Sequence, residues 1–198
     1  MGSVNRQMFS RIFFIVFLVA AWSCEEEKIE IYNEGNYWTA EEALALGELV
    51  NYMDDHLMNN YDVANINLAY QTYSIKLIDG LKSGSGSMDK FTGPGFDIDK
   101  LVFRDKIWAK MPLVDENRVQ VDTFYDYAPN SAYLDYLEAV PDTTGHTKKY
   151  AELLRRIGDI TPSWFVEYAD VSRTRDFSDP NQRLIFAVHF ITLSNAKY

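Results

Sequence analysis

The chain begins with a short apolar stretch that ends close to its only cysteine, Cys24. Residues 12–22 are apolar without interruption, Arg6 and Arg11 precede them, and no acidic residue stands before the cysteine. A helix needs about 17–25 apolar residues to cross a bilayer, so this stretch is too short for an ordinary transmembrane span. A basic flank, a short apolar run and small residues behind it are typical of a secretory signal peptide. We therefore assign residues 1–23 to an export signal that lies outside the folded domain.

The residues directly before the cysteine indicate the kind of signal. Cys24 follows Ala21, Trp22 and Ser23 at the end of the apolar run. This arrangement resembles the lipobox of bacterial lipoproteins, in which a short apolar stretch and a small residue precede an invariant cysteine. The resemblance implies that the Cys24 thiol receives diacylglycerol, that the signal is removed before it, and that the new amino group takes an acyl chain such as palmitate. The alternative is an ordinary secretory signal with a cysteine near its end.

An acidic segment follows the cysteine. Glu25, Glu26 and Glu27 come first, and residues 24–38 are polar without sustained periodicity, so we expect an acidic tether. Acidic residues at this place resemble the export signal of surface-exposed lipoproteins in some Gram-negative bacteria, although a solvated tether uses them equally well. Stable attachment takes two or more acyl chains, which a lipoprotein cysteine supplies. We expect an exported, outer-membrane, lipid-anchored protein whose domain faces either the cell surface or the interior of the envelope.

Composition excludes several classes of protein. The chain is 47% hydrophobic and 15% aromatic, which is enough to bury a core and rules out global disorder. Its formal charge of −10 becomes −12 once Arg6 and Arg11 leave with the signal, and this argues against a nucleic-acid partner. A single cysteine excludes an intramolecular disulfide and a Cys-rich zinc site.

The first half of the body predicts two helices. Thr39 and Glu42 form a capping-box pattern, and the apolar residues behind it recur at spacings of three and four, which predicts a helix over 40–58. Residues 62–82 fit a second helix; part of this segment also alternates as a strand would, but its length favours the helix. The two helices would form an antiparallel hairpin, followed by a loop rich in Gly and Ser at 83–95.

The second half of the body predicts further strands and helices. Alternating residues on both sides of a polar turn at 115–117 predict a β-hairpin, and Pro112 favours an edge position for its first strand. We expect helices over 131–140 and 147–158 and strands over 164–169 and 184–193. The last strand is apolar on both faces, as a central strand would be. The predicted class is α+β, with an N-terminal helical hairpin packed on a largely antiparallel β-sheet in a single globular domain, residues 39–198.

Motifs of common enzyme chemistries are absent from the sequence. There is no phosphate-binding loop, dinucleotide fingerprint, nucleophile elbow or paired-histidine zinc motif. His56, His146 and His189 show no ligand spacing, and we interpret His189, inside an apolar segment, as a core histidine. We therefore assign no catalytic residue, no cofactor and no metal ligand. A cone-shaped arrangement of helices and a curved sheet around an internal pocket is also permitted by the order of elements, and a pocket with His or Asp would favour an enzyme.

Oxygen-rich turns and an arginine cluster are weaker candidates for binding sites. Asp97 and Asp99, and the segment 176–181, could hold calcium, but Asp, Asn, Ser and Gly are also what plain turns use. We favour the turns. Three arginines that lie close in sequence either hold an anionic group or pair with surrounding acids, and we favour the pairing: Arg173, Arg175 and Arg183.

The aromatic residues carry the functional hypothesis. Trp108, Tyr125 and Tyr127 lie in or near the predicted hairpin, and exposed rings of this kind suit sugars and protein interfaces; the alternative is that they form core. We expect a non-catalytic binding or accessory module of the cell envelope, with a protein or glycan partner and no nucleic acid. The alternative is a lipid-tethered hydrolase of glycans or peptidoglycan that uses carboxylates.

Overall fold

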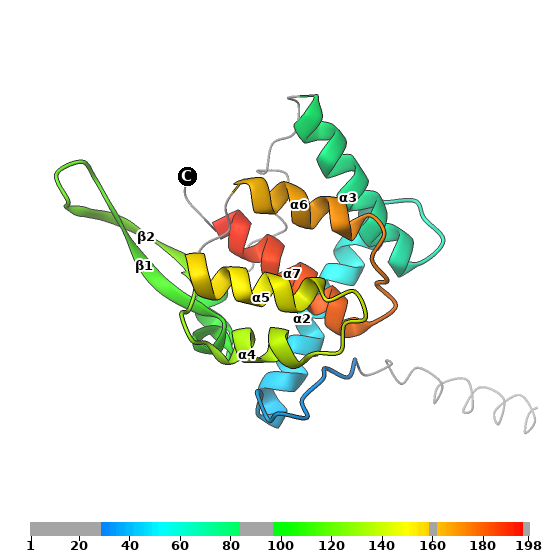
Figure 1. The fold of residues 1–198 in the computed structure, drawn as a ribbon, viewed down its shortest axis with the longest axis horizontal. Helices are drawn as coiled ribbons and strands as arrows, with labels where there is room; N and C mark the ends of the chain where they lie inside the picture. The colour runs from blue at the N-terminus through cyan, green and yellow to red at the C-terminus, as the bar shows by residue number, and fades with distance from the viewer. Residues whose placement is uncertain (1–28, 84–96, 159–161, 196–198) are drawn as a thin grey trace, which may run out of the picture.

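A computed structural model describes residues 29–83, 97–158 and 162–195 of the chain. These residues form a body of α-helices from which one long β-hairpin projects (Figure 1). The combination of helices with an antiparallel sheet confirms the predicted α+β class. The proposed signal, Cys24 and most of the loop rich in Gly and Ser lie outside the described residues.

The two N-terminal helices form as the sequence predicts. Helix α2 (Ala40–Asn60) begins at a complete capping box, in which Thr39 Oγ1 accepts from the Glu42 amide at 3.2 Å and Glu42 Oε2 accepts from the Thr39 amide at 2.7 Å. Helix α3 (Ile66–Lys82) is capped by the side chain of Asn65. Its buried positions recur at helical spacing, which confirms the helix over the strand for this segment. The two helices contact each other.

The predicted hairpin is also present. Strand β1 (Trp108–Val114) pairs antiparallel with β2 (Gln120–Tyr127), after two short 3-10 helices, η2 (Ile98–Lys100) and η3 (Arg104–Lys106). Pro112 lies opposite Thr123, and the register shifts between Leu113 and Val114. The sheet consists of these two strands within the described residues, so Pro112 is on an edge.

Two short helices follow at the predicted places. Helix α4 (Ala132–Ala139) is capped by Ser131, and helix α5 (His146–Ile157) ends at Gly158, whose φ of 78° needs a residue without a side chain. The helices contact each other, and Arg155 of α5 forms ion pairs with two carboxylates of α4. Both predicted helices are confirmed.

The strand predicted over 164–169 is wrong. These residues belong to helix α6 (Pro162–Ser172), whose buried residues are Phe165, Tyr168, Ala169 and Ser172. They are spaced by three, one and three, which places them on one face of a helix. A six-residue window that is rich in aromatic and β-branched side chains is too short to show this period, so propensity favoured the strand.

The central strand predicted over 184–193 is wrong for a related reason. The segment lies within helix α7 (Pro180–Asn195), and every residue from Leu184 to Leu193 is buried. A helix that is apolar on all sides is surrounded by other elements, and its composition cannot be distinguished from that of a doubly covered strand. Helix α7 contacts α2 and β2. Without this strand, the described sheet is much smaller than the sequence suggests.

Part of the expected tether packs on the body. Ile31 and Trp38 are 5% and 3% exposed, and Asn33 exchanges two hydrogen bonds with the main chain of Trp38, at 2.8 and 3.0 Å. The amide of Tyr32 donates to Asn181 Oδ1 at 2.8 Å, which joins this segment to the start of α7. Two large apolar side chains therefore hold residues 29–38 against the helices, although this segment also contains Glu30 and Glu34.

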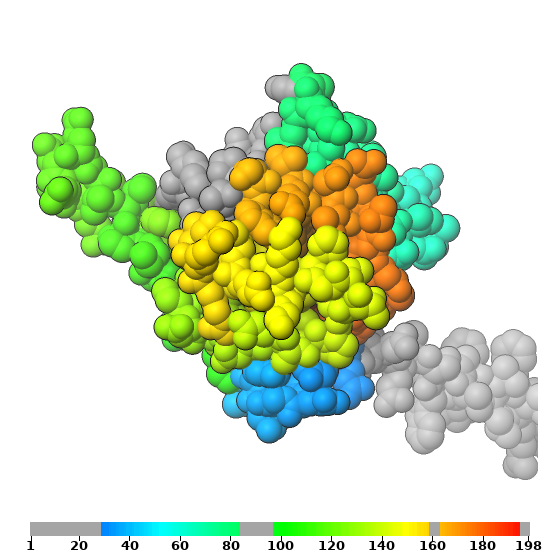
Figure 2. All heavy atoms as spheres, in the orientation of Figure 1, coloured from blue at the N-terminus to red at the C-terminus, as the bar shows by residue number. Residues whose placement is uncertain are grey.

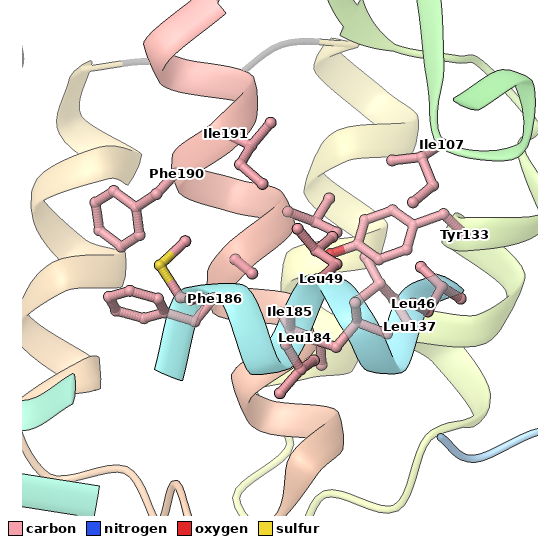
Figure 3. Close-up of a cluster of buried hydrophobic side chains, with 14 of the residues drawn as sticks. Leu46, Leu49, Ile107, Tyr133, Leu137, Leu184, Ile185, Phe186, Phe190 and Ile191 are labelled. Atoms are coloured by element: carbon pink, nitrogen blue, oxygen red, sulfur yellow. The ribbon is translucent and has the colours of Figure 1, made fainter. Parts of the chain in front are cut away.

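The hydrophobic core is built around α7. Figure 3 shows side chains of α7, including Ile185, Phe186 and Phe190, among residues from α2 and α4. Burial of each such side chain contributes about 1.5–3 kcal/mol relative to exposure. Aromatic rings fill much of this space; Tyr70 of α3, for example, stacks on Phe177 with ring centroids 4.6 Å apart. Most of the aromatic side chains in the described part of the chain therefore belong to the core.

Candidate functional site

The β-hairpin extends well beyond the helices that support its base. We refer to residues 108–127 as the hairpin arm. Figure 2 shows the arm as a narrow projection whose outer part has no other described segment against it. Four apolar side chains of the arm are exposed: Met111 (41%), Val114 (51%), Val119 (58%) and Val121 (59%). Such a group of apolar side chains on a projection is typical of a surface that meets another molecule.

The turn at the tip holds these valines in a fixed arrangement. Asp115 Oδ1 accepts from the amides of Asn117 and Val119 at 2.9 and 2.8 Å. The main chain closes the same turn, because the amide of Asp115 donates to the carbonyl of Val119 at 2.9 Å. Arg118 has a φ of 62°, a conformation that non-glycine residues rarely adopt. The tip is therefore an ordered turn rather than a loose loop.

The base of the arm is fixed to the helical body. Trp108 Nε1 donates to Thr192 Oγ1 of α7 at 2.7 Å, and the phenol oxygens of Tyr127 and Tyr150 lie 2.9 Å apart. The Tyr127 ring also stacks on Tyr133 of α4, with centroids 5.9 Å apart. A two-stranded hairpin alone is only marginally stable in water, so these contacts supply what the sheet itself cannot.

The three aromatic residues that the sequence nominated for ligand contact lie at this base. Trp108 and Tyr127 are 1% and 3% exposed, and their polar atoms are bonded within the protein. Tyr125 is 9% exposed; its hydroxyl donates to Asp99, and Lys110 Nζ lies 5.5 Å from its ring centroid. The structure thus brings the three residues together, but it turns them toward the protein.

The histidines have separate environments. His56 lies near the end of α2 and His146 is the first residue of α5. His189 is fully buried in α7, with Nδ1 2.8 Å from the Tyr150 hydroxyl and the Tyr168 ring stacked on it at 4.0 Å. Its Nε2 has no hydrogen-bond partner among the described residues. Burial, with a smaller effect from the charge of Arg175, lowers the pKa of His189 to about 3, so this core histidine is neutral.

The oxygen-rich segments serve the local fold. Asp97 caps η2, and Asp99 pairs with Arg104 and Lys110 and accepts from Tyr125. In the second segment, the carboxylate of Asp179 accepts from the Asn181 amide at the start of α7. Over the parts of the chain that the structure describes, no three His, Cys, Asp or Glu side chains gather as a metal site would require.

An acidic cleft of about 1010 Å³ lies between the N-terminal segment, α2 and the start of α7. Its lining includes Glu30, Glu48, Asp54, Asp55 and Arg183. Arg183 pairs with Asp54, which also accepts from the Tyr70 hydroxyl at 2.8 Å. Burial outweighs these partners and raises the pKa of Asp54. Asp54 is therefore already engaged in joining α2, α3 and α7.

The other two arginines of the sequence cluster are paired as well. Arg173 pairs with Asp170 at 2.8 Å, and Arg175 donates to Gln182 at 2.8 Å and lies over the Tyr168 ring. Each arginine of the cluster thus has its own partner within the protein. The arrangement is three separate contacts rather than one anion site.

The exposed valines of the arm were not singled out by the sequence. Their alternation with polar residues did predict a strand, but an alternating strand usually buries one face. What exposes them is the length of the arm, which carries the outer half of each strand past the helices. The buried end and the exposed end of β2 both alternate apolar with polar residues, so only the fold shows which end is exposed.

Comparison with known proteins gives no assignment: no family model matches the chain, and no curated protein or solved structure matches it significantly. Among the helices that the structure describes, none combines the length and the apolar character needed to span a membrane. The function must therefore be inferred from the arm and from the N-terminal sequence.

Proposed function

We propose that this protein is a lipid-anchored envelope lipoprotein that acts as a non-catalytic binding module, and that the hairpin arm binds a protein partner. One observation carries the proposal: the arm projects from the body and exposes Val114, Val119 and Val121 near its tip. Apolar side chains at the centre of protein interfaces contribute binding energy because association removes them from water.

A protein partner fits the arm better than a glycan does. Sugar recognition relies on flat aromatic faces, and the rings of Trp108 and Tyr127 are buried against the body. The exposed apolar side chains at the end of the arm are aliphatic instead: Val114, Val119 and Val121. Aliphatic side chains offer area and shape to an apolar protein surface, and they offer no hydrogen bonds to sugar hydroxyls.

The fold supports the arm from behind. Helix α7 contacts both β2 and α2, so the N-terminal helices and the sheet share one supporting element. We also propose that the helical hairpin α2–α3 supports the sheet through its contact with α7. In this arrangement the arm is a rigid extension of the body, and binding at its tip needs no ordering of a loose segment.

Photo-crosslinking in living cells tests the proposed function. A photoreactive amino acid is placed at Val119 in the full-length chain, and a matched control carries it at Ile75, an exposed apolar position on α3. We expect discrete adducts to a protein from Val119 and none from Ile75. The adduct is identified by mass spectrometry, and the purified partner should bind the wild-type chain at least tenfold more tightly than Val121→Asp. Equal adducts from both positions, or none from Val119, would contradict the proposal.

A further inference from the structure

The edges of the arm are protected against the addition of another strand. On β1, Pro112 has no amide hydrogen to offer. On β2, the amides of Thr123 and Tyr127 already donate to the carboxylates of Asp122 and Asp126, at 2.8 and 2.7 Å. Prolines and charged side chains at an edge are means by which proteins prevent strand pairing. A partner therefore contacts the side chains of the tip rather than the main chain of the arm.

The tip is also acidic. Asp115, Glu116 and Asp122 lie at or beside the turn, with Arg118 as the one basic residue from 114 to 122. Lys110, lower on the arm, is paired with Asp99 and does not offset this charge. The exposed valines therefore lie within a negative field, which favours a partner with basic groups around its apolar surface.

A second copy of this chain is disfavoured as the occupant. Two arms that meet tip to tip would bring their carboxylates together, and the chain as a whole carries a formal charge of −10. Like charges placed opposite each other at an interface oppose association. An anionic membrane surface is disfavoured for the same reason.

The N-terminal segment indicates where the arm points. Residues 29–39 lie along the lower side of the helical body in Figure 1, and the tip of the arm lies far from them at the upper left. The end of this segment meets the base of the arm, where Lys106 Nζ donates to the Tyr37 carbonyl at 2.9 Å. From Cys24 to Ile29 the chain advances five residues, which span at most about 18 Å. If Cys24 carries the lipid, the body lies close to the membrane and the arm extends away from it.

From these observations we infer that the arm tip binds a different protein, which presents an apolar surface bordered by Lys or Arg and lies away from the anchoring membrane. The contact uses the side chains of Val114, Val119 and Val121, with Glu116 and Asp122 facing the basic groups of the partner. This inference rests on the proposed function and adds the chemistry of the partner to it.

Two designed peptides serve as probes. Both are amphipathic 16-residue helices with leucine on one face, and the other face carries lysine in one peptide and glutamate in the other. The purified full-length chain, in a non-ionic detergent, carries the photoreactive residue at Val119, at Ile75, or at Asn51, which lines the acidic cleft. The Asn51 position measures the general attraction of a cationic peptide to an acidic protein.

We expect the photo-crosslinking yield at Val119 to be about tenfold higher with the lysine peptide than with the glutamate peptide. The yield at Val119 should also exceed those at Asn51 and Ile75. At about 1 M salt, where charges are screened over about 3 Å, most of the preference should disappear. The double variant Glu116→Gln/Asp122→Asn, which keeps the valines, should reduce the preference for the lysine peptide at low salt.

Three results would overturn the inference: equal yields with both peptides, a yield at Asn51 that matches Val119, or a crosslink from Val119 to a second copy of the chain. Failure of the proposed function is distinguishable from these. A clear lysine preference at Val119 together with no adduct in cells would overturn the binding function and leave the chemistry of the tip established.

Discussion

Tyr150 of α5 and His189 of α7 share a hydrogen bond of 2.8 Å inside the core, and the Tyr150 hydroxyl also lies 2.9 Å from that of Tyr127. This chain of polar atoms joins the base of the hairpin arm to two helices. All three side chains are buried, so each depends on the others for its hydrogen bonds. The burial of His189, with a smaller effect from the charge of Arg175, also makes the stability of the fold sensitive to acid.

The free energy of unfolding should fall as the pH is lowered below about 6.5. The folded-state pKa of His189 is about 3 and the ordinary value is 6.5, so the unfolded chain takes up a proton that the folded chain excludes. Stability from this residue is complete above pH 6.5 and is lost at about 1.4 kcal/mol per pH unit as the pH falls toward 3. Urea titrations at pH 7, 6 and 5 measure the slope.

Two variants distinguish this cause from others. His189→Phe keeps a buried ring and removes the titrating group, so its slope between pH 7 and 5 should be nearly flat. Tyr150→Phe removes a hydrogen bond but leaves His189 buried, so stability should fall by about 1 kcal/mol while the slope persists. A His189→Phe slope equal to that of the wild type would refute the assignment.

Thr39→Ala should lower the free energy of unfolding by about 1 kcal/mol, because the capping box of α2 loses its side-chain acceptor. Thr39→Ser keeps the hydroxyl and should stay within about 0.5 kcal/mol of the wild type. Chemical denaturation at neutral pH measures both. The assignment of the cap fails if the two variants are equally destabilised.

Val119→Asp and Val121→Asp should leave the fold intact and remove binding. Both side chains are more than half exposed, so the free energy of unfolding should change by less than about 0.5 kcal/mol. Affinity for the protein captured at Val119 should fall at least tenfold, because each substitution places a charge in the apolar contact. Ile75→Asp is the matched control. A similar loss of affinity in this variant would contradict the proposed role of the arm in binding.

Cys24→Ala should abolish labelling by a radioactive fatty acid and move the protein out of the membrane fraction. In the bacterial lipoproteins whose lipobox this sequence resembles, the cysteine thiol accepts the lipid, and the chain has no other cysteine to replace it. Ser23→Ala keeps a small residue before the cysteine and should be labelled normally. Unchanged labelling of Cys24→Ala would exclude the lipoprotein assignment.

Local signals in the sequence predicted those elements whose ends are marked by side-chain chemistry. The capping box at Thr39, the cap at Ser131, the glycine at 158 and the turn at Asp115 all act within a few residues, so the sequence alone reveals them. The packing of residues 29–38 on the body has no such local mark. It depends on Asn181, almost 150 residues away.

Helices α6 and α7 could not be predicted in the same way. Helix α7 is apolar on all sides because other elements cover it, and an apolar residue does not show whether it belongs to a strand or a helix. Helix α6 buries only one face, but the predicted window of six residues was too short to show its period. The candidate site has the same difficulty. Val121 and Tyr125 both alternate with polar residues in β2, yet one is exposed and the other is buried, because the helices support only the inner part of the arm.

Helix α7 connects the two ends of the protein mechanically. Asn181 near its start holds Tyr32 of the N-terminal segment, and Thr192 near its end holds Trp108 at the base of the arm. Eleven residues of helix separate them, about 16 Å along the axis. If the N-terminal segment is anchored, a partner that pulls on the arm loads this helix, together with the contacts of Lys106 with Tyr37 and Glu42 at the base of the arm. Asn181→Ala should lower the force at which the chain unfolds when it is stretched between residue 29 and the arm tip, as optical tweezers would measure; an unchanged force would show that tension takes another route.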